Sequence, residues 1–511
     1  MTSGAWRGEH LVFTYQWERC APAGTGCAPV LGGTSQGQVP FDAYALTQAD
    51  VGSRIEVTVT ATNPAGSAEA TSNESGPVLA AGPPVAAGRL ERFDVFSPAV
   101  GRAQPVYVYL PPEYDPARRP RYPVLYLLHG YPGGPGSFVG GVPAGPTEDR
   151  LLARGLVPPT ILVMPQGAPN PLTETSWVDG VGPHAAWETF LARDVVGWVD
   201  RTFDADRAAR GRAIAGISDG GYGALDIALH HPHEFAVVES WSGYEHADPT
   251  ETAVYGTSAR LLAEDSPAVI LARTAPVLRR AGVVFWLSVG WQDGLRFENA
   301  QFASRLVTAR VPHRFVLLPG SHLPSVYRAE LPAALVAASR PDVVATAAGA
   351  RGPALGFAIA QQGAPDGPAA AGVVGMQASG GGVVTLRRAL SPRAVQEGLP
   401  VSGSIRLTLE PARGGPLQLR LRLGAGAVAA AEAGKQTATL LALPARVVSS
   451  SDGACPVGAG GFVDLETADD ATGTTHFLVV DLRPRCPYDL GFDDAPWRDL
   501  PAGAFRLRLG R

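Results

Sequence analysis

The chain has 511 residues and a formal net charge of −5, and it is 45% hydrophobic and only 17% charged. This length exceeds what one hydrophobic core usually supports, so we expect about three domains, most of them folded. The sequence has no long run of lysine and arginine and no apolar stretch of about 18 residues, which excludes nucleic-acid binding and a membrane span from the expected functions.

Short runs of alternating polar and apolar residues fill the first part of the chain, as in residues 54–62, and glycine, asparagine and proline turns separate them. This pattern predicts a small antiparallel β-sandwich. Residues 15–20, 44–52 and 61–68 resemble the bacterial immunoglobulin-like (Ig-like) repeats that are found beside secreted enzymes. The resemblance implies that residues 1–80 form an Ig-like domain.

The four cysteines fall into two local pairs, Cys20 with Cys27 and Cys455 with Cys486. Neither pair has a nearby histidine or a second cysteine pair to complete a tetrahedral zinc site, so disulfides are favoured over metal binding and over buried thiols. Disulfides imply an oxidising compartment. We therefore expect a secreted or cell-surface protein.

The first residues, 1–7, have neither the apolar core nor the small-residue cleavage site of an export signal. Ig-like repeats usually have one more strand before this point, so the resemblance implies that an upstream part with the signal is missing. The alternative is that the protein stays inside the cell.

A stretch of small residues with a proline pair, residues 81–89, is predicted to be a linker. From residue 90 to residue 340, short apolar runs alternate with longer helical stretches, which predicts an α/β domain with a mostly parallel sheet. The expected strands are 106–110, 124–128, 160–164, 213–216, 236–241, 283–289 and 314–318.

The last part of the chain again has the pattern of β-structure. A stretch rich in alanine, glycine and proline over residues 341–370 is predicted to be a second linker. Alternating runs such as 404–409 and 417–423 then predict a C-terminal all-β domain over residues 371–511. The sequence of this domain indicates no role for it.

The motif G-x-S-x-G occurs at residues 216–220, between an apolar run and a helical one. In a strand–turn–helix of this kind the serine, here Ser218, lies exposed at the top of the sheet, and the glycines tolerate strained dihedral angles and close packing. Such a cluster can also arise by chance in a chain with 61 glycines. The presence of a suitable acid and histidine later in the sequence decides between the two interpretations.

A nucleophilic serine needs a histidine to take its proton and an acid to orient that histidine. After Ser218, one apolar strand leads into a loop with Asp293, and the next leads into a loop with His322. Both loops are expected at the edge of the sheet that also bears Ser218. The sequence therefore predicts a catalytic triad of Ser218, His322 and Asp293, with Glu298 as the alternative acid.

An acyl-transfer site also needs two backbone N–H groups that stabilise the oxyanion. One is expected from Asp219, the residue after the nucleophile. The other is expected from Tyr131, which follows an early strand and precedes Pro132, a residue without an N–H. His129, in the same loop, either takes part in the site or only braces the loop by hydrogen bonding.

The middle region resembles the esterase D-like family, which includes S-formylglutathione hydrolases, feruloyl esterases and the mycobacterial mycolyltransferases. The matching segments are 106–115, 122–130, 187–191 and the G-x-S-x-G motif. The resemblance implies an α/β-hydrolase fold, the nucleophile Ser218, the acid Asp293, the base His322, and oxyanion N–H groups at Tyr131 and Asp219.

The chain departs from the family pattern at one of these positions. Many relatives have methionine where this chain has Asp219, so we expect this carboxylate to point away from the oxyanion. The family pattern also suggests that Glu188 is a buried structural acid, and we assign it no catalytic role.

These observations predict a secreted serine carboxylic-ester hydrolase that forms an acyl-enzyme and needs no metal or organic cofactor. The expected substrate is a small-molecule ester or an ester linked to a polysaccharide, and the β domains are candidates for contact with a cell wall or polysaccharide. One alternative is a mycolyltransferase-like acyltransferase that uses the same triad. The other is a non-catalytic adhesion or carbohydrate-binding protein.

Overall fold

A computed structural model gives the fold of this chain. The residues that it describes are 12–22, 26–37, 44, 46–72, 74–75, 77–78, 85–340, 354–360, 377–386, 401–410, 417–433, 436–450, 457–470, 473–481 and 506–510. The chain divides into two compact units, Met1–Val85 and Ala86–Arg511.

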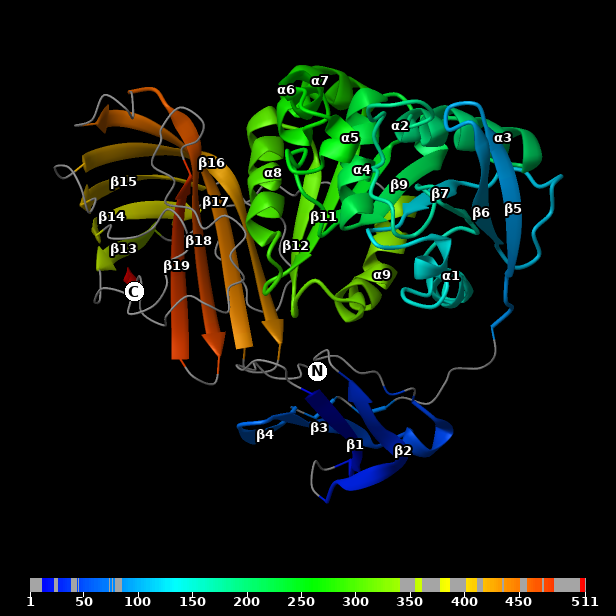
Figure 1. The fold of residues 1–511 in the computed structure, drawn as a ribbon, viewed down its shortest axis with the longest axis horizontal. Helices are drawn as coiled ribbons and strands as arrows, with labels where there is room; N and C mark the ends of the chain where they lie inside the picture. The colour runs from blue at the N-terminus through cyan, green and yellow to red at the C-terminus, as the bar shows by residue number, and fades with distance from the viewer. Residues whose placement is uncertain are drawn as a thin grey trace. The chain divides into compact units, whose positions relative to one another are not determined.

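The first unit contains a four-stranded antiparallel sheet in the order β2-β1-β3-β4 (Figure 1). Its strands are β1 (Val12–Cys20), β2 (Ala28–Gly37), β3 (Arg54–Asn63) and β4 (Gly66–Thr71), and the 3₁₀-helix Gln48–Asp50 precedes β3. Alternate residues of β1 and β3 are buried, as expected for strands with one face against a core. The Ig-like β-sandwich itself stays a prediction.

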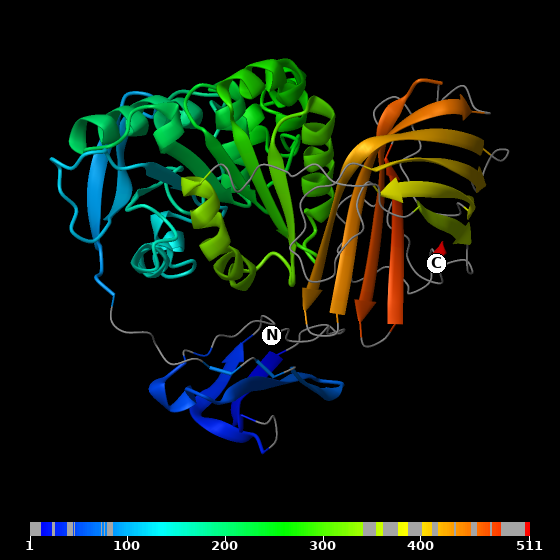
Figure 2. The same ribbon diagram turned by 180° about the vertical axis from the view of Figure 1, so that it is seen from behind.

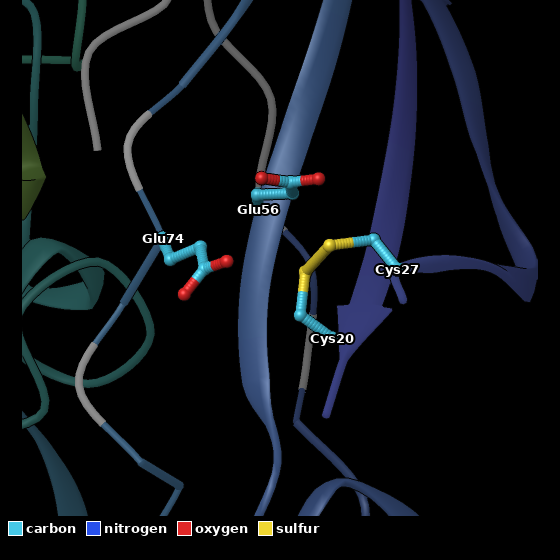
Figure 3. Close-up of side chains that lie close together, drawn as sticks. All are labelled: Cys20, Cys27, Glu56 and Glu74. Carbon is cyan, nitrogen blue, oxygen red and sulfur yellow. A yellow bond between two sulfur atoms is a disulfide. The ribbon is translucent and has the colours of Figure 1, made fainter. Parts of the chain in front are cut away.

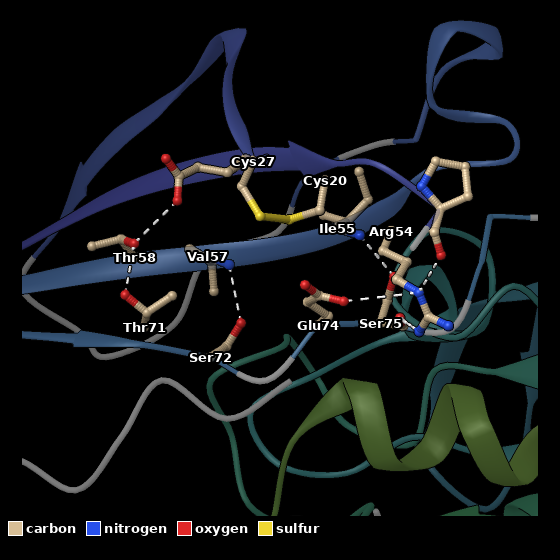
Figure 4. The surroundings of a disulfide bond; sticks show 12 residues. Cys20, Cys27, Arg54, Ile55, Val57, Thr58, Thr71, Ser72, Glu74 and Ser75 are labelled. Atoms are coloured by element: carbon tan, nitrogen blue, oxygen red, sulfur yellow. Dashed lines mark hydrogen bonds and ion pairs between the residues drawn. A yellow bond between two sulfur atoms is a disulfide. The ribbon is translucent and has the colours of Figure 1, made fainter. Parts of the chain in front are cut away.

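A disulfide joins Cys20 to Cys27 between β1 and β2 (Figure 3), which confirms the predicted pairing. Beside it, Ile55 N donates to Ser75 Oγ at 2.9 Å and Val57 N donates to Ser72 Oγ at 3.0 Å, so the segment after β4 is fastened to β3 (Figure 4). The second predicted pair, Cys455 with Cys486, lies outside the described residues.

The second unit begins with an eight-stranded sheet in the order β12-β11-β10-β9-β7-β8-β6-β5, with helices on both faces (Figures 1 and 2). All neighbours from β12 to β8 are parallel, and only β6 and β5 are antiparallel to their neighbours. The strands are β5 (Arg89–Ser97), β6 (Arg102–Leu110), β7 (Val124–Leu128), β8 (Ile161–Pro165), β9 (Arg212–Ile217), β10 (Val237–Trp241), β11 (Val284–Gly290) and β12 (His313–Leu318).

The predicted mostly parallel sheet is therefore confirmed, and each expected strand matches an observed one. The helices that cover it are α1 (Ala144–Ala153), α2 (Trp187–Thr189), α3 (Val196–Thr202), α4 (Asp219–His230), α5 (Thr252–Tyr255), α6 (Ala259–Glu264), α7 (Pro267–Ala281), α8 (Arg296–Ala309) and α9 (Pro324–Ser339). A π-helix, Phe190–Val195, joins α2 to α3, and short 3₁₀-helices span Pro135–Phe138 and Ala209–Gly211. Among the described helices, none is long and apolar enough to cross a membrane.

Two hydrophobic clusters lie on opposite faces of this sheet, because neighbouring residues of each strand point to opposite sides. Tyr126 and Phe285 belong to the cluster that includes α4, α7 and α8. Leu127 and Trp286 belong to the cluster that includes α1 and α9. Both faces of the central strands are therefore buried, which explains why their sequences are continuously apolar.

The second unit also contains an eight-stranded antiparallel sheet in the order β19-β18-β17-β16-β15-β14-β13-β20. Its strands are β13 (Ala354–Ala360), β14 (Gln377–Leu386), β15 (Val401–Glu410), β16 (Leu417–Ala433), β17 (Gln436–Ser450), β18 (Gly460–Asp470), β19 (Gly473–Asp481) and β20 (Arg506–Gly510). β13 lies within residues 341–370, and the linker predicted over this stretch stays a prediction. The other domain limits, 1–80, 81–89, 90–340 and 371–511, stay predictions.

Candidate active site

Ser218 lies at the tight turn between β9 and α4, with φ 56° and ψ −120°. A positive φ is strained for a residue with a side chain, and such strain is typical of functional sites. Glycine is required on both sides of the turn: a Cβ at Gly216 would lie 2.0 Å from Gly220 O, and a Cβ at Gly220 would lie 2.1 Å from Leu128 O. The turn therefore has the close strand–helix packing that the G-x-S-x-G motif predicted.

His322 and Asp293 lie in the loops after two neighbouring parallel strands, β12 and β11. His322 Nδ1 is 2.8 Å from Asp293 Oδ2, and the other carboxylate oxygen accepts from Leu295 N at 2.9 Å. Since a carboxylate only accepts, Nδ1 carries the proton and leaves Nε2 as the basic nitrogen. The side chain of Asp293 is 1% exposed and that of His322 is 39% exposed, so the acid is shielded while the imidazole faces solvent.

The alternative acid, Glu298, is directed elsewhere. It lies in the first turn of α8, and its Oε2 accepts from Glu245 N at 3.0 Å. Of the two acids, Asp293 is thus the one that the structure brings to His322.

Ser218 follows β9, which lies in the same parallel set as β10, β11 and β12. The carboxyl ends of parallel strands share one edge, so Ser218, Asp293 and His322 are all at this edge of the sheet. No hydrogen bond joins Ser218 to His322 within the described part of the chain. Nucleophile–base contacts are often long without a substrate and shorten when one binds.

The loop after β7 passes beside the nucleophile. A Cβ at Gly130 would lie 3.1 Å from Ser218 Cβ, which brings the next residue, Tyr131, to the rim of the site. His129 fixes this loop: it accepts from Gly167 N at Nε2 (3.0 Å) and donates from Nδ1 to Gly130 O (2.9 Å). Burial lowers the pKa of His129 to about 4, so the ring stays neutral in this bracing arrangement.

Asp219 is the first residue of α4, where backbone N–H groups have no acceptor within the helix. Its side chain is buried and accepts from Tyr244 OH at 2.9 Å, and the Tyr244 ring stacks on Tyr222 with centroids 4.4 Å apart. Burial and the nearby Glu174 raise the pKa of Asp219 well above its usual value. The neutral form of this carboxyl is therefore favoured, which reduces its opposition to a negative oxyanion.

Among the residues that the structure describes, two groups of side chains have the donor atoms that a metal ion needs. In the first, Cys20, Cys27, Glu56 and Glu74 lie close together, but the two sulfurs are already bonded to each other (Figure 3). A disulfide sulfur is not the thiolate that binds metals. This group therefore fits a disulfide better than a metal ion.

The second group is Glu188, Asp226 and His230. Glu188 Oε2 is 3.0 Å from His230 Nδ1, and Glu188 Oε1 is 2.8 Å from His231 Nε2. Burial alone would raise the pKa of Glu188, but the two histidine contacts lower it to about 2. The arrangement is that of an ion-paired network that joins α2 to the end of α4, in line with the structural role suggested for Glu188.

Part of the chain is similar to known esterases. Residues 97–337 match the family model described as "Putative esterase". This region is therefore similar to that esterase family. The chain is 30% identical over 291 residues to Esterase Rv1288 of Mycobacterium tuberculosis. The aligned region covers 51% of this chain and 61% of the relative. The chain therefore spans less than two thirds of the length of this relative.

A second relative is the MPT51/MPB51 antigen of Mycobacterium tuberculosis, which is 32% identical over 178 residues and matches 35% of this chain and 53% of its own length. Among solved structures, a ferulic acid esterase is similar with a TM-score of 0.44 and 23% identity, over 50% of this chain and 98% of its own.

Proposed function

We propose that this protein is a secreted serine carboxylic-ester hydrolase with Ser218 as nucleophile, His322 as base and Asp293 as the orienting acid. The observation that carries the proposal is the hydrogen bond between His322 and Asp293 at the same sheet edge as the strained Ser218. The match of residues 97–337 to the esterase family model supports the reaction class. The Cys20–Cys27 disulfide supports an oxidising location.

In the first half of the reaction, Ser218 Oγ attacks the ester carbonyl carbon and its proton passes to His322 Nε2. The negative charge that develops on the carbonyl oxygen is stabilised by the N–H groups of Tyr131 and Asp219. The imidazolium then gives its proton to the leaving alkoxide, which departs as an alcohol. Ser218 is left as an acyl ester.

In the second half, a water molecule attacks the acyl ester and gives a proton to His322. The tetrahedral intermediate collapses, Ser218 regains its proton, and the carboxylic acid leaves. Asp293 keeps the imidazole in the correct tautomer throughout and stabilises its positive form. The chemistry therefore uses side chains and backbone N–H groups of this chain alone.

The rim of the site favours an ester with an apolar or aromatic group. Tyr131 is 47% exposed and Leu172 is 75% exposed, and the Tyr131 hydroxyl is 3.4 Å from Leu172 O, so the two lie side by side next to the oxyanion loop. Exposed apolar side chains beside a reaction centre are suited to an apolar or aromatic substrate group. We propose small-molecule esters or polysaccharide-linked esters as the substrate class.

The test is the substitution Ser218→Ala, with Ser67→Ala as the matched control because Ser67 is exposed in the first unit. The wild type and Ser67→Ala should hydrolyse 4-nitrophenyl acetate and react covalently with a fluorophosphonate. Ser218→Ala should do neither while keeping its circular dichroism spectrum. Equal turnover by Ser218→Ala would refute the assignment, and a wild type that does not react with the probe would favour a non-catalytic role.

An acyltransferase is the second candidate, because the 39% exposure of His322 leaves room for an alcohol as well as water to reach the acyl-enzyme. The triad would act identically, with an alcohol hydroxyl in place of water. Product analysis with and without added trehalose distinguishes the two. A new trehalose ester at the expense of free acid indicates the transferase.

A further inference from the structure

Helix α8 begins three residues after Asp293 and packs against the C-terminal sheet. Ser304 Oγ donates to Ala442 O on β17 at 2.6 Å and accepts from Ala427 N on β16 at 2.7 Å. The pairing of β16 with β17 is irregular between Leu423 and Ala427, so the serine supplies hydrogen bonds at the interruption. The helix is thus anchored in the backbone of the sheet.

A second contact of α8 reaches β18. Gln301 Nε2 donates to Asp464 Oδ2 at 2.6 Å. One turn further along the helix, the Arg305 guanidinium lies over the Phe462 ring, 4.7 Å from its centroid. Polar and apolar contacts therefore fix α8 against three strands of the C-terminal sheet.

Arg296, the first residue of α8, makes the contact that links the C-terminal sheet to the main chain of Asp293. Its Nε and Nη2 donate to Glu466 Oε2 on β18 at 3.1 and 3.0 Å, and its Nη1 donates to Asp293 O at 2.7 Å. The Arg296 guanidinium thus connects Asp293, the proposed triad acid, to Glu466, which lies 170 positions after Arg296 in the sequence. The rigid fork of donors in arginine suits this double role.

This ion pair is buried, with the Arg296 and Glu466 side chains 2% and 7% exposed. Removing two charges from water costs free energy that their attraction does not always regain, so such a pair is weak evidence for a gain in stability. A pair of this kind does fix geometry, because both groups lose their partners if either moves. Its position beside Asp293 indicates what is being fixed.

The same helix also holds the loop after β10, which borders the nucleophile turn. Asn299 Nδ2 donates to Gly243 O at 2.6 Å, and Arg305 Nε donates to Glu245 Oε2 at 2.7 Å. A Cβ at Gly243 would lie 2.7 Å from the backbone of Gly221, in the first turn of α4. A displacement of α8 would therefore disturb both the acid loop and the surroundings of Ser218.

We propose that the C-terminal sheet positions the active site: Glu466 holds Arg296, and Arg296 holds the main chain of Asp293 so that the carboxylate faces His322. This inference rests on the proposed function and gives residues 371–511 a role in it. Arg296 and Glu466 are positioning residues that act through Asp293.

The test uses the double variant Arg296→Met/Glu466→Leu, which removes both charges and leaves neither buried alone. The matched control is Gln301→Met, which removes another contact between α8 and β18 but none to Asp293, and which keeps the Asp464 charge near Arg296. All variants are made in the full chain. Melting temperature and circular dichroism show whether each variant is folded.

The first readout is hydrolysis of 4-nitrophenyl acetate. Misplacing a catalytic group by about 1 Å lowers rates by up to about 100-fold, so kcat of the Arg296/Glu466 variant should fall between about 10-fold and 100-fold. Its KM should change little, because the substrate does not contact this pair. The Gln301→Met control should keep kcat within about twofold, and Arg296→Lys, which keeps the charge, should be intermediate.

The second readout does not need turnover. The proton between His322 Nδ1 and Asp293 gives a downfield NMR resonance, assigned by its loss in His322→Gln. It should shift or broaden in the Arg296/Glu466 variant and stay in the control. If the Arg296/Glu466 variant keeps both its kcat and this resonance unchanged, the positioning proposal is overturned. A wild type with no hydrolysis and no fluorophosphonate labelling would instead overturn the proposed function. The resonance would then remain as the test of positioning.

Discussion

Substituting Asp293 by asparagine should stop the proposed reaction because of the way the carboxylate is held. Its Oδ1 accepts from Leu295 N at 2.9 Å, and its Oδ2 faces His322 Nδ1 at 2.8 Å. In asparagine only the carbonyl oxygen can accept from Leu295 N, so the amide NH₂ turns toward Nδ1. His322 must then carry its proton on Nε2, the nitrogen that has to take the proton of Ser218.

An imidazole in the wrong tautomer lowers kcat by about 10⁴-fold, or roughly 5.5 kcal/mol of transition-state stabilisation. The assay is steady-state hydrolysis of 4-nitrophenyl acetate, with ¹⁵N NMR of His322 to identify the protonated nitrogen. The matched control is Glu298→Gln, which keeps an acceptor for Glu245 N and should change kcat by less than about threefold. The reasoning fails if Asp293→Asn keeps a tenth of the wild-type kcat, or if Glu298→Gln loses as much.

Two further predictions concern stability. Replacing Cys20 and Cys27 by serine removes a cross-link between residues 7 positions apart at the ends of β1 and β2. These two strands should therefore open about 2 kcal/mol more easily, and their amide hydrogens should exchange about 30-fold faster. Unchanged exchange rates would contradict this prediction. Burial raises the pKa of Glu148 from 4.5 in the unfolded chain to about 8, so folding loses stability as pH rises through this window. The melting temperature of Glu148→Gln relative to wild type should therefore increase from pH 5 to pH 8, and a constant difference would contradict the argument.

The central strands could be predicted because each is buried on both faces and reads as a short apolar run. β5, at the exposed edge of the sheet, was not predicted. Its sequence over Arg89–Ser97 includes four charged residues, and only Val95 and Ser97 are buried, so neither an apolar run nor a clean alternation appears. The sequence of β13 also lacks a clear strand pattern. Its small residues resemble the alanine- and glycine-rich sequence on either side of it, so the pattern predicts a linker there.

The candidate site was largely predictable from local signals. A serine in a G-x-S-x-G motif, and an acid and a histidine after successive apolar strands, are each visible within a few residues. The choice between Asp293 and Glu298 was not decided by the sequence, because both lie within reach of a loop after β11. The fold separates them, since Glu298 lies within α8 and hydrogen-bonds Glu245 N, whereas Asp293 lies before the helix and contacts His322.

The pairing of Arg296 with Glu466 has no local signature, because the two residues are far apart in the sequence and on elements of different types. It does suggest how a scaffold role and a positioning role can be told apart. A buried ion pair replaced by two apolar side chains is often neutral or favourable for stability. If the C-terminal sheet were only a scaffold, rate and stability would change together in the Arg296→Met/Glu466→Leu variant. If the pair serves to place Asp293, the melting temperature should hold or rise while kcat falls, and this opposite movement is the signature that a purely structural contact does not produce.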